Sequence, residues 1–456
     1  MEREKFKSRL GFILISAGCA IGIGNVWRFP YVVGNNGGGC FVLFYVLFLV
    51  ILGLPILTME FSVGRASQQS IARAFTTLEK KGQFWHLHGY IGMVGNYILM
   101  MFYTTVAGWM LKYFFDTAKG DFIGATTSQV KDRFTDMNSV PSEMIFWTVV
   151  VIIIGFLVCS LGLQNGVEKI SKGMMIALLV IMAVLAINSI FLKGASKGLY
   201  FYLVPDFQQI KNIGLINVLV AAMNQAFFTL SIGMGSMTIF GSYLSKDHSL
   251  LGESINIVAL DTFVAIVSGL IIFPSCFAFG VNPDQGPSLI FVTLPNIFIK
   301  MPGGRIIGSC FFIFMAFAAF STVIAVFENI MSSCMDLWGW GRKKTALINT
   351  ILIIIGSIPC VLGFNILSGF HPLGKGTNVM DLEDFLVSNL ILPIGSLIYT
   401  LFCTSKYGWG WDNYLKEVNT GNGLNVPGKI RFYCKWILPL VTLFIIVNGL
   451  ISVFNK

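Results

Sequence analysis

Apolar segments of about 20 residues recur along the whole chain, and each is long enough to cross a bilayer as a helix. Of the 456 residues, 55% are hydrophobic and only 12% are charged. A soluble domain is roughly 25% charged. The sequence therefore predicts an all-α membrane protein with no separate soluble domain. We expect eleven transmembrane helices over residues 10–30, 40–64, 90–115, 143–162, 169–192, 214–242, 252–280, 304–337, 345–364, 380–404 and 434–454.

The distribution of Lys and Arg indicates how these spans are oriented. If the N-terminus is inside, more than half of the 31 Lys and Arg residues fall in cytoplasmic segments. We therefore expect residues 1–9 to be a cytoplasmic N-terminal segment, with the C-terminus outside. The net charge of +9 then reflects the loops rather than a nucleic-acid surface.

The first span, LGFILISAGCAIGIGNVWRFP, begins as an apolar helix and then becomes rich in small residues. Gly18, Gly22 and Gly24 lie within seven residues, and each glycine weakens a helix by about 1 kcal/mol relative to alanine. A helix broken at mid-membrane, with its carbonyls facing a cavity, is typical of a transport site. A helix-packing face explains the glycines about as well. It does not explain Asn25 and Arg28 beside them.

The sixth span contains a similar stretch. SIGMGS at residues 231–236 corresponds to AIGIGN at residues 20–25, and the second stretch lies five spans after the first. An odd number of spans inverts the second copy in the membrane, and paired broken spans are typical of inverted-repeat transporters. We expect a 5+5 inverted repeat with discontinuous helices 1 and 6. The first repeat would cover residues 10–192, the second 214–405, and the eleventh span 434–454.

Polar groups that can bind sodium fall where the two halves would meet. Sodium is a hard cation that binds oxygen, at about five or six ligands. The candidates are the carbonyls freed by the broken first span, with Asn25, Thr229, Asp261, Ser321 and Thr322. A charge within a span indicates a functional site by default. Asp261 could instead pair with a neighbouring helix, and the two hydroxyls of the eighth span could bond their own helix.

These stretches resemble motifs of the neurotransmitter:sodium symporter family, in its bacterial amino-acid transporter branch with the leucine-transporter fold. The similar segments are AIGIGNVWRFP, GGGCFVLFYV, GLPILTMEFSVGR, QAFFTLSIGMG and GPSLIFVTLP. The resemblance extends over nearly the whole chain. It implies a multi-pass symporter of the bacterial inner membrane that works by alternating access. Its partners would be the lipid bilayer and a small amino-acid substrate, with no nucleic acid and no obligate protein partner.

The resemblance also implies two sodium sites and one substrate site. The first sodium site would comprise Ala20, Asn25, Thr229 and Asp261, with the substrate carboxylate. The second would comprise Gly18, Ile21, Ala318, Ser321 and Thr322. The substrate would contact Cys19, Ala20, Ile23, Gly24, Leu99, Tyr103, Phe228, Thr229, Ser231, Met234, Thr322 and Val326. Tyr103 would donate its hydroxyl to the substrate carboxylate, and Phe228 would cover the pocket.

Two positions bear on what is carried. Relatives that transport amines have an aspartate at the position of Gly22, so a glycine there favours an amino acid with its own carboxylate. We expect a neutral L-amino acid, hydrophobic or aromatic, beside the flexible wall of Met234. Chloride-dependent relatives have asparagine at the position of Asp261 and a serine four residues later, where this chain has Ala265. We therefore expect transport that does not depend on chloride.

The resemblance implies two gates, formed by Arg28 with Asp384 outside and by Arg3 with Asp336 inside. Phe6 and Tyr243 would lie beside the inner gate. The alternative is that these charged side chains only reach towards water from the helix ends. Glu60 would support the broken first helix, and Glu328 would form hydrogen bonds within the bundle.

Three segments carry further expectations. Relatives pair a glycine at the start of the fifth span with a proline further along, where this chain has Gly166 and Ile176. Either Gly173 would weaken the helix instead, or the route of sodium release would differ in this chain. Residues 281–303 predict a hairpin on the outer side. Residues 406–433 predict a polar cytoplasmic linker.

Other classes of protein fit the sequence less well. A proton-coupled amino-acid transporter is the nearest alternative, because Asp261 or Glu60 could carry a proton. An ion channel would need rings of carbonyls or charges. We do not expect an enzyme, because none of the four histidines lies near the broken helices and no catalytic motif is present.

Overall fold

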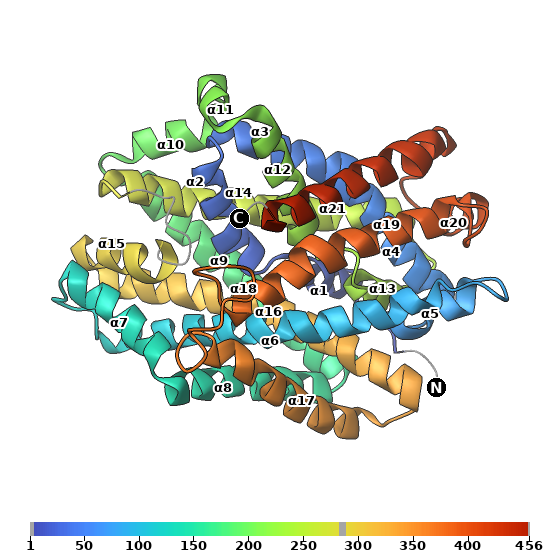
Figure 1. Ribbon diagram of the computed structural model, residues 1–456, viewed down its shortest axis with the longest axis horizontal. Coiled ribbons are helices and arrows are strands. Elements are labelled where there is room, and N and C mark those ends of the chain that lie inside the picture. Colours follow the sequence, from blue (N-terminus) through green and yellow to red (C-terminus); the bar gives the residue numbers. More distant parts are fainter. Residues whose placement is uncertain (1–3, 282–288, 455–456) are drawn as a thin grey trace.

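The computed structural model describes residues 4–281 and 289–454, which form a bundle of helices (Figure 1). Within these ranges, nine helices are long and apolar enough to cross a membrane, or up to eleven if each of two bent helix pairs is one span. No strand is present in the described part of the chain, where two isolated β-bridges occur. The protein is therefore an all-α membrane protein.

The spans follow the predicted order, and several contain a π-helical turn (η). Spans 1–5 are α1 (Arg9–Ala20) with η1 (Gly24–Arg28) and α2 (Phe29–Asn35); α3 (Gly39–Phe48) with η2 (Leu49–Gly53) and α4 (Leu54–Ser67); α6 (His86–Lys119); α8 (Pro141–Ser160); and η3 (Leu163–Glu168) with α9 (Lys169–Ile190). Spans 6–8 are α12 (Leu215–Thr229) with α13 (Ser236–Ser242); α14 (Leu250–Ala278); and α16 (Gly304–Trp338). Spans 9–11 are α17 (Arg342–Leu362); α18 (Val379–Phe385) with η5 (Leu386–Ile391) and α19 (Leu392–Thr404); and η7 (Tyr433–Ile437) with α21 (Leu438–Phe454).

Shorter helices lie in the connections. They are α5 (Ile71–Leu78), α7 (Thr127–Ser139), α10 (Ala195–Leu203), α11 (Phe207–Ile213), η4 (Leu289–Thr293), α15 (Leu294–Lys300), α20 (Trp411–Val418) and the 3₁₀ turn η6 (Gly428–Ile430).

Both predicted helix breaks are present. In the first span, α1 ends at Ala20, Ile21 is extended (φ −73°, ψ 95°), and the chain resumes as a helix bent by 53°. In the sixth span, residues 230–235 separate α12 from α13, and Ser231, Gly233 and Gly235 have φ values of 50°, 102° and 80°. Two of these three left-handed positions are glycines, which adopt such angles at no steric cost. A further bend of 98° separates α11 from α12, at a position that the sequence did not indicate.

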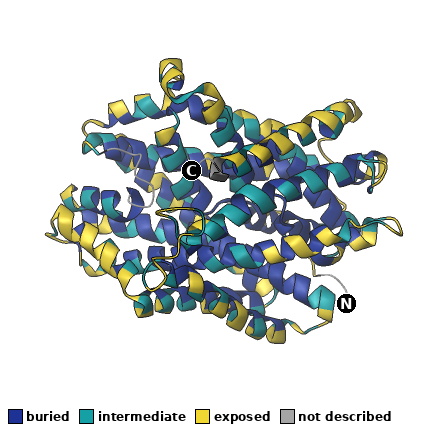
Figure 2. Ribbon diagram, in the orientation of Figure 1, coloured by how far each residue is buried: buried dark blue, intermediate teal, exposed yellow. Residues whose placement is uncertain are grey.

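The centre of the bundle is buried and its outer helices expose apolar side chains, as lipid contact requires (Figure 2). In the most apolar stretch of 18 residues in α16, 83% of the residues are buried. In the corresponding stretch of the span formed by η3 and α9, only 33% are buried. Leu157, Val180 and Ile355 are each 59% exposed. The helix α16 is therefore the central element against which the functional residues are placed.

Three connecting segments differ in detail from the sequence-based expectations. Gly166 lies in the π-helical turn η3, while Gly173 and Ile176 lie inside continuous α9, so the helix is not interrupted at Gly173. Residues 294–300 form the short helix α15, and residues 282–288 of the predicted hairpin lie outside the described residues. The predicted linker 406–433 contains the short helix α20, which packs against α4.

A buried ion pair fixes α20 to the bundle. Arg65 of α4 is fully buried, and its Nε lies 2.6 Å from Glu417 Oε1. Its guanidinium also donates to the carbonyls of His248 and Thr420, at 2.7 and 3.3 Å. The linker thereby joins the C-terminal end of α4 to the loop that follows α13.

Candidate functional site

The two helix breaks lie against each other at the centre of the bundle. Ser231 Oγ donates to the carbonyl of Cys19 at 3.4 Å, and Gln225 Nε2 donates to the carbonyl of Gly24 at 3.1 Å. Side chains of the sixth span therefore satisfy carbonyls that the break in the first span leaves free, as buried backbone groups require.

A buried carboxylate holds the second break. Glu60 of α4 is 0% exposed and accepts from the backbone nitrogens of Gly233 at 2.8 Å and Met237 at 3.0 Å. These donors belong to the loop before α13 and to its first turn, where backbone N–H groups lack helical partners. The resemblance implied that Glu60 supports the first helix, whereas its hydrogen bonds with described residues go to the sixth span.

The structure brings three residues of the predicted first sodium site into contact. Asn25 Nδ2 donates to Asp261 Oδ1 at 2.8 Å, and Thr229 Oγ1 lies 3.3 and 3.2 Å from the two oxygens of the same carboxylate. All three residues are at most 1% exposed. Asp261 has no ion pair with any described Lys or Arg. A buried carboxylate without a cation is costly, so this set of oxygens fits a bound sodium ion.

The residues of the predicted second sodium site also converge, between α1 and α16. Ser321 Oγ lies 3.1 Å from the carbonyl oxygen of Ile21 and 2.8 Å from that of Ala318. Thr322 Oγ1 lies 3.3 Å from the carbonyl oxygen of Gly18 and 3.5 Å from that of Ile21. Two hydroxyls and three carbonyls thus form a cluster of five oxygens, a donor set that suits a hard cation.

Next to these clusters lies a central cavity of about 20 Å³, which holds little more than one water molecule. Its lining residues are Cys19, Ala20, Gly22, Gly24, Leu99, Tyr103, Phe228, Ser231, Met234, Thr322 and Leu392. Most of the predicted substrate contacts lie in this wall. Ile23, Thr229 and Val326 do not, and Leu392 is an additional lining residue for which the sequence contains no signal. Tyr103 Oη accepts from the backbone nitrogen of Ile23 at 2.9 Å.

On the side of Arg28 and Asp384, a further cavity of about 260 Å³ lies above the central one. Ile23, Tyr103 and Phe228 belong to its wall, together with both predicted gate residues. The Arg28 guanidinium carbon lies 4.0 Å from the centre of the Phe228 ring. No ion pair joins Arg28 to Asp384, whose Oδ1 accepts from Ser388 at 2.7 Å. The expected outer ion pair is thus not formed, and a cation–π contact covers the Phe228 side of the pocket.

At the opposite end of the bundle from Arg28 and Asp384, the predicted inner gate is only partly described, because Arg3 lies outside the described residues. Asp336 accepts from the backbone nitrogen of Ser70 at 2.7 Å, and the rings of Phe6 and Tyr243 pack edge to face at 5.6 Å. Asp336 also lines a cavity of about 400 Å³ that contains Tyr243 and Arg342. These contacts place the predicted residues of the inner gate near one another.

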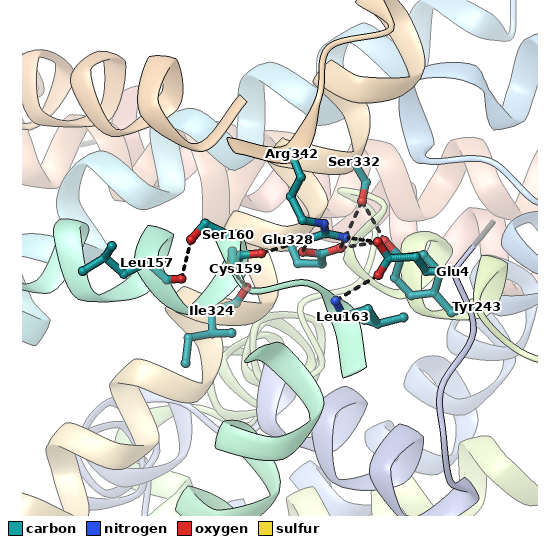
Figure 3. Close-up of polar contacts among 10 residues, drawn as sticks. All are labelled: Glu4, Leu157, Cys159, Ser160, Leu163, Tyr243, Ile324, Glu328, Ser332 and Arg342. Atoms are coloured by element: carbon teal, nitrogen blue, oxygen red, sulfur yellow. Dashed lines mark hydrogen bonds and ion pairs between the residues drawn. The ribbon is translucent and has the colours of Figure 1, made fainter. Parts of the chain in front are cut away.

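A second set of polar contacts beside the inner gate was predicted only in part (Figure 3). Glu328 is fully buried and accepts from Arg342 Nη1 at 2.7 Å, with Nη2 lying 3.0 Å from its other oxygen. Tyr243 Oη donates to the same carboxylate at 2.8 Å. Arg342 also lies 3.2 Å from Glu4, whose Oε2 accepts from the backbone nitrogen of Leu163. The sequence indicated Glu328 but no partner for it.

The N-terminal segment is also tied to the start of the fifth span. Glu168 accepts from the backbone nitrogens of Lys7 and Ser8, at 2.8 and 3.1 Å, and from Ser8 Oγ at 2.9 Å. Glu168 ends the π-helical turn that contains Gly166. The sequence offered no signal for this contact, since about 160 residues separate the two segments.

The chain is similar over almost its whole length to proteins of one family. The profile of the Sodium:neurotransmitter symporter family matches residues 3–123 and 118–456. An uncharacterized sodium-dependent transporter of Bacillus subtilis, YhdH, is 34% identical over 455 residues, or 98% of each chain. The sodium- and chloride-dependent GABA transporter 2 of Rattus norvegicus is 22% identical over 99% of this chain and 81% of its own. The crystal structure of MhsT in complex with L-phenylalanine has a TM-score of 0.88 and 36% identity, over 98% of this chain and 100% of that one.

Proposed function

Since the chain belongs to the sodium:neurotransmitter symporter family and is a sodium-dependent symporter, we propose that it takes up a neutral, hydrophobic or aromatic L-amino acid. It would do so across the bacterial cell membrane by alternating access, with its N-terminus inside. Two sodium ions would bind in the two oxygen clusters beside the central cavity, and chloride would not be required.

The observation that carries this proposal is the cluster of Asn25, Thr229 and Asp261 at the junction of the two helix breaks. It is fully buried and contains one carboxyl group, that of Asp261, which has no ion pair with any described Lys or Arg. Sodium would supply that charge. A substrate carboxylate at the same point would complete the coordination shell, so each would bind more tightly in the presence of the other.

Two features support an amino acid rather than an amine as the substrate. A Cβ atom on Gly22 would overlap Tyr103 Oη and Thr322 Oγ1, which leaves no space for an aspartate side chain. Tyr103 lines the central cavity, and its hydroxyl accepts from the backbone nitrogen of Ile23. Its own proton would be donated to the substrate carboxylate. The carboxylate that binds sodium would therefore come from the substrate itself.

The remaining wall of the cavity supports an apolar side chain on the substrate. Leu99, Phe228, Met234 and Leu392 line it. MhsT, the similar protein of known structure, is in complex with L-phenylalanine. A cavity of about 20 Å³ must enlarge to admit any amino acid. Met234 supports such a change because its unbranched thioether can adopt several rotamers and it lies between two glycines in the break.

Chloride independence is supported by the fixed charge near the first sodium site. The Asp261 carboxylate neutralises part of the sodium charge, and Ala265, one turn further along α14, offers no hydroxyl to an anion. An added chloride ion would meet like charge there. Chloride in the medium would therefore have no role.

The direct test is uptake into proteoliposomes, with each of the twenty amino acids and an imposed sodium gradient, an imposed proton gradient or neither. We expect accumulation of apolar and aromatic amino acids under the sodium gradient alone. Accumulation under the proton gradient alone would refute sodium coupling in favour of proton coupling.

A matched pair of variants tests the substrate site. Tyr103→Phe removes one charge-assisted hydrogen bond worth about 1.5–3 kcal/mol, so the substrate Kd should rise by roughly 10-fold to 150-fold. Tyr407→Phe, at a tyrosine that is 66% exposed, is the control and should leave the Kd unchanged. Equal affinities for the two variants would exclude Tyr103 from the site.

A further inference from the structure

A large cavity lies apart from the transport site and is lined by residues of α6, α7 and the start of α8. These three helices are labelled in Figure 1. Its volume is about 650 Å³, and it shares no lining residue with the central cavity or with the cavity above it. It therefore requires an explanation of its own.

The wall of this cavity is acidic, although the whole chain has a net charge of +9. Two basic side chains, Lys112 and Arg133, face five carboxylates in the wall. The carboxylates belong to Asp116, Asp121, Asp132, Asp136 and Glu143. The cavity thus has three negative charges in excess.

Lys112 is already occupied by two of these carboxylates. Its Nζ lies 2.7 Å from Asp116 Oδ2 and 2.9 Å from Glu143 Oε1. The Arg133 guanidinium lies 5.4 Å from the ring of Phe122. The three other carboxylates have no ion pair with any residue that the structure describes. Asp121, Asp132 and Asp136 therefore have no ion-pair partner, and Arg133 can offset only part of their charge.

A buried tyrosine in the same wall lacks a hydrogen-bond partner. Tyr113 is 1% exposed and lines the cavity, and its hydroxyl makes no hydrogen bond within the described part of the chain. Its ring packs against Phe122, Phe291 and Phe312, with centroids 5.0–5.6 Å apart. Buried hydroxyls are nearly always hydrogen-bonded. An unsatisfied one in the wall of a charged cavity therefore points to a polar ligand.

An apolar cavity of about 260 Å³ adjoins the acidic one, and the two share Ile123 and Gly124 in their walls. Pro295, Phe298 and Ile299 line the apolar cavity. A ligand that reaches across residues 123–124 would place a cationic end among carboxylates and an apolar end among hydrophobic side chains.

We propose that this pair of cavities binds an amphipathic organic amine. Its ammonium group lies between Asp132 and Asp136 and near the Tyr113 hydroxyl, and its hydrocarbon part lies against Phe298. A metal ion fits less well, because the described residues contain no group of three or more His, Cys, Asp or Glu side chains arranged to hold one. The volume also greatly exceeds that of a bare ion.

The test uses hexylamine as the probe, with the full-length protein in lipid nanodiscs and calorimetric titration as the readout. We expect saturable binding, with hexan-1-ol, which has the same chain but no charge, binding at least about tenfold more weakly. The double variant Asp132→Asn and Asp136→Asn should weaken hexylamine binding by about tenfold or more, and Tyr113→Phe by about threefold. Asp412→Asn, at an exposed aspartate of α20, is the control and should have no effect.

Sodium-driven uptake of the amino-acid substrate should persist in all these variants, which shows that each is folded and that the cavity is separate from the transport site. Three results would overturn the proposal. These are equal binding of hexan-1-ol and hexylamine, unchanged hexylamine affinity in the double variant, and displacement of hexylamine by the transported amino acid. The last result would place the amine in the central cavity instead.

Discussion

Replacing Asp261 by asparagine tests the electrostatic basis of the first sodium site. The substitution keeps the shape of the side chain and its neighbours Asn25 and Thr229, but it removes the only charge in a cluster that is at most 1% exposed. Every difference between the two proteins should then reflect the lost carboxylate charge.

The size of the effect follows from Coulomb's law. A unit charge about 4 Å from sodium, at an effective dielectric constant of about 20, contributes about 4 kcal/mol. Each 1.4 kcal/mol is about a tenfold change in affinity, so the sodium affinity should fall by roughly 10²-fold to 10³-fold. In the absence of sodium, the substitution should stabilise the protein. The variant no longer buries an unpaired charge, and its free energy of unfolding should rise.

Two measurements check this reasoning. Sodium titration of substrate binding gives the affinity, and thermal unfolding with and without sodium gives the change in stability. Sodium should raise the melting temperature of the unmodified protein strongly and that of Asp261→Asn weakly. A sodium affinity within about threefold of the original, in a folded variant, would refute the role of Asp261.

Three further outcomes follow from the structure. Gly22→Ala places a methyl group where Tyr103 Oη and Thr322 Oγ1 lie. The substrate affinity should therefore fall by at least about tenfold. An unchanged affinity would show that the pocket accommodates the methyl group. Arg65→Leu leaves Glu417 buried without its main partner and should cost about 3 kcal/mol or more of stability, seen as a lower melting temperature in a thermal unfolding assay. Replacing chloride by gluconate should leave the initial rate of uptake unchanged, and a slower rate would contradict chloride-independent transport.

The alternation of long apolar runs with short polar connections was sufficient to predict an all-α fold with up to eleven spans. The glycines of the first and sixth spans were sufficient to predict the two discontinuous helices, because backbone angles such as those of Gly233 and Gly235 are a local property of the residue. The match to the family profile confirms the predicted family. That prediction was possible because the family's motifs are contiguous in the chain. The bounds of the two repeats, 10–192 and 214–405, remain predictions.

The contacts between distant segments were decided by the tertiary structure alone. Arg342, the first residue of α17, pairs with Glu328 of α16, and Glu168 binds the backbone of Lys7 and Ser8, about 160 residues away. The sequence also predicted an ion pair for Arg28, whose side chain instead lies over Phe228. A residue type states which interactions a side chain is able to make. Which of them it makes depends on the atoms that packing brings within a few ångströms, and those atoms come from segments whose spacing the chain order does not encode.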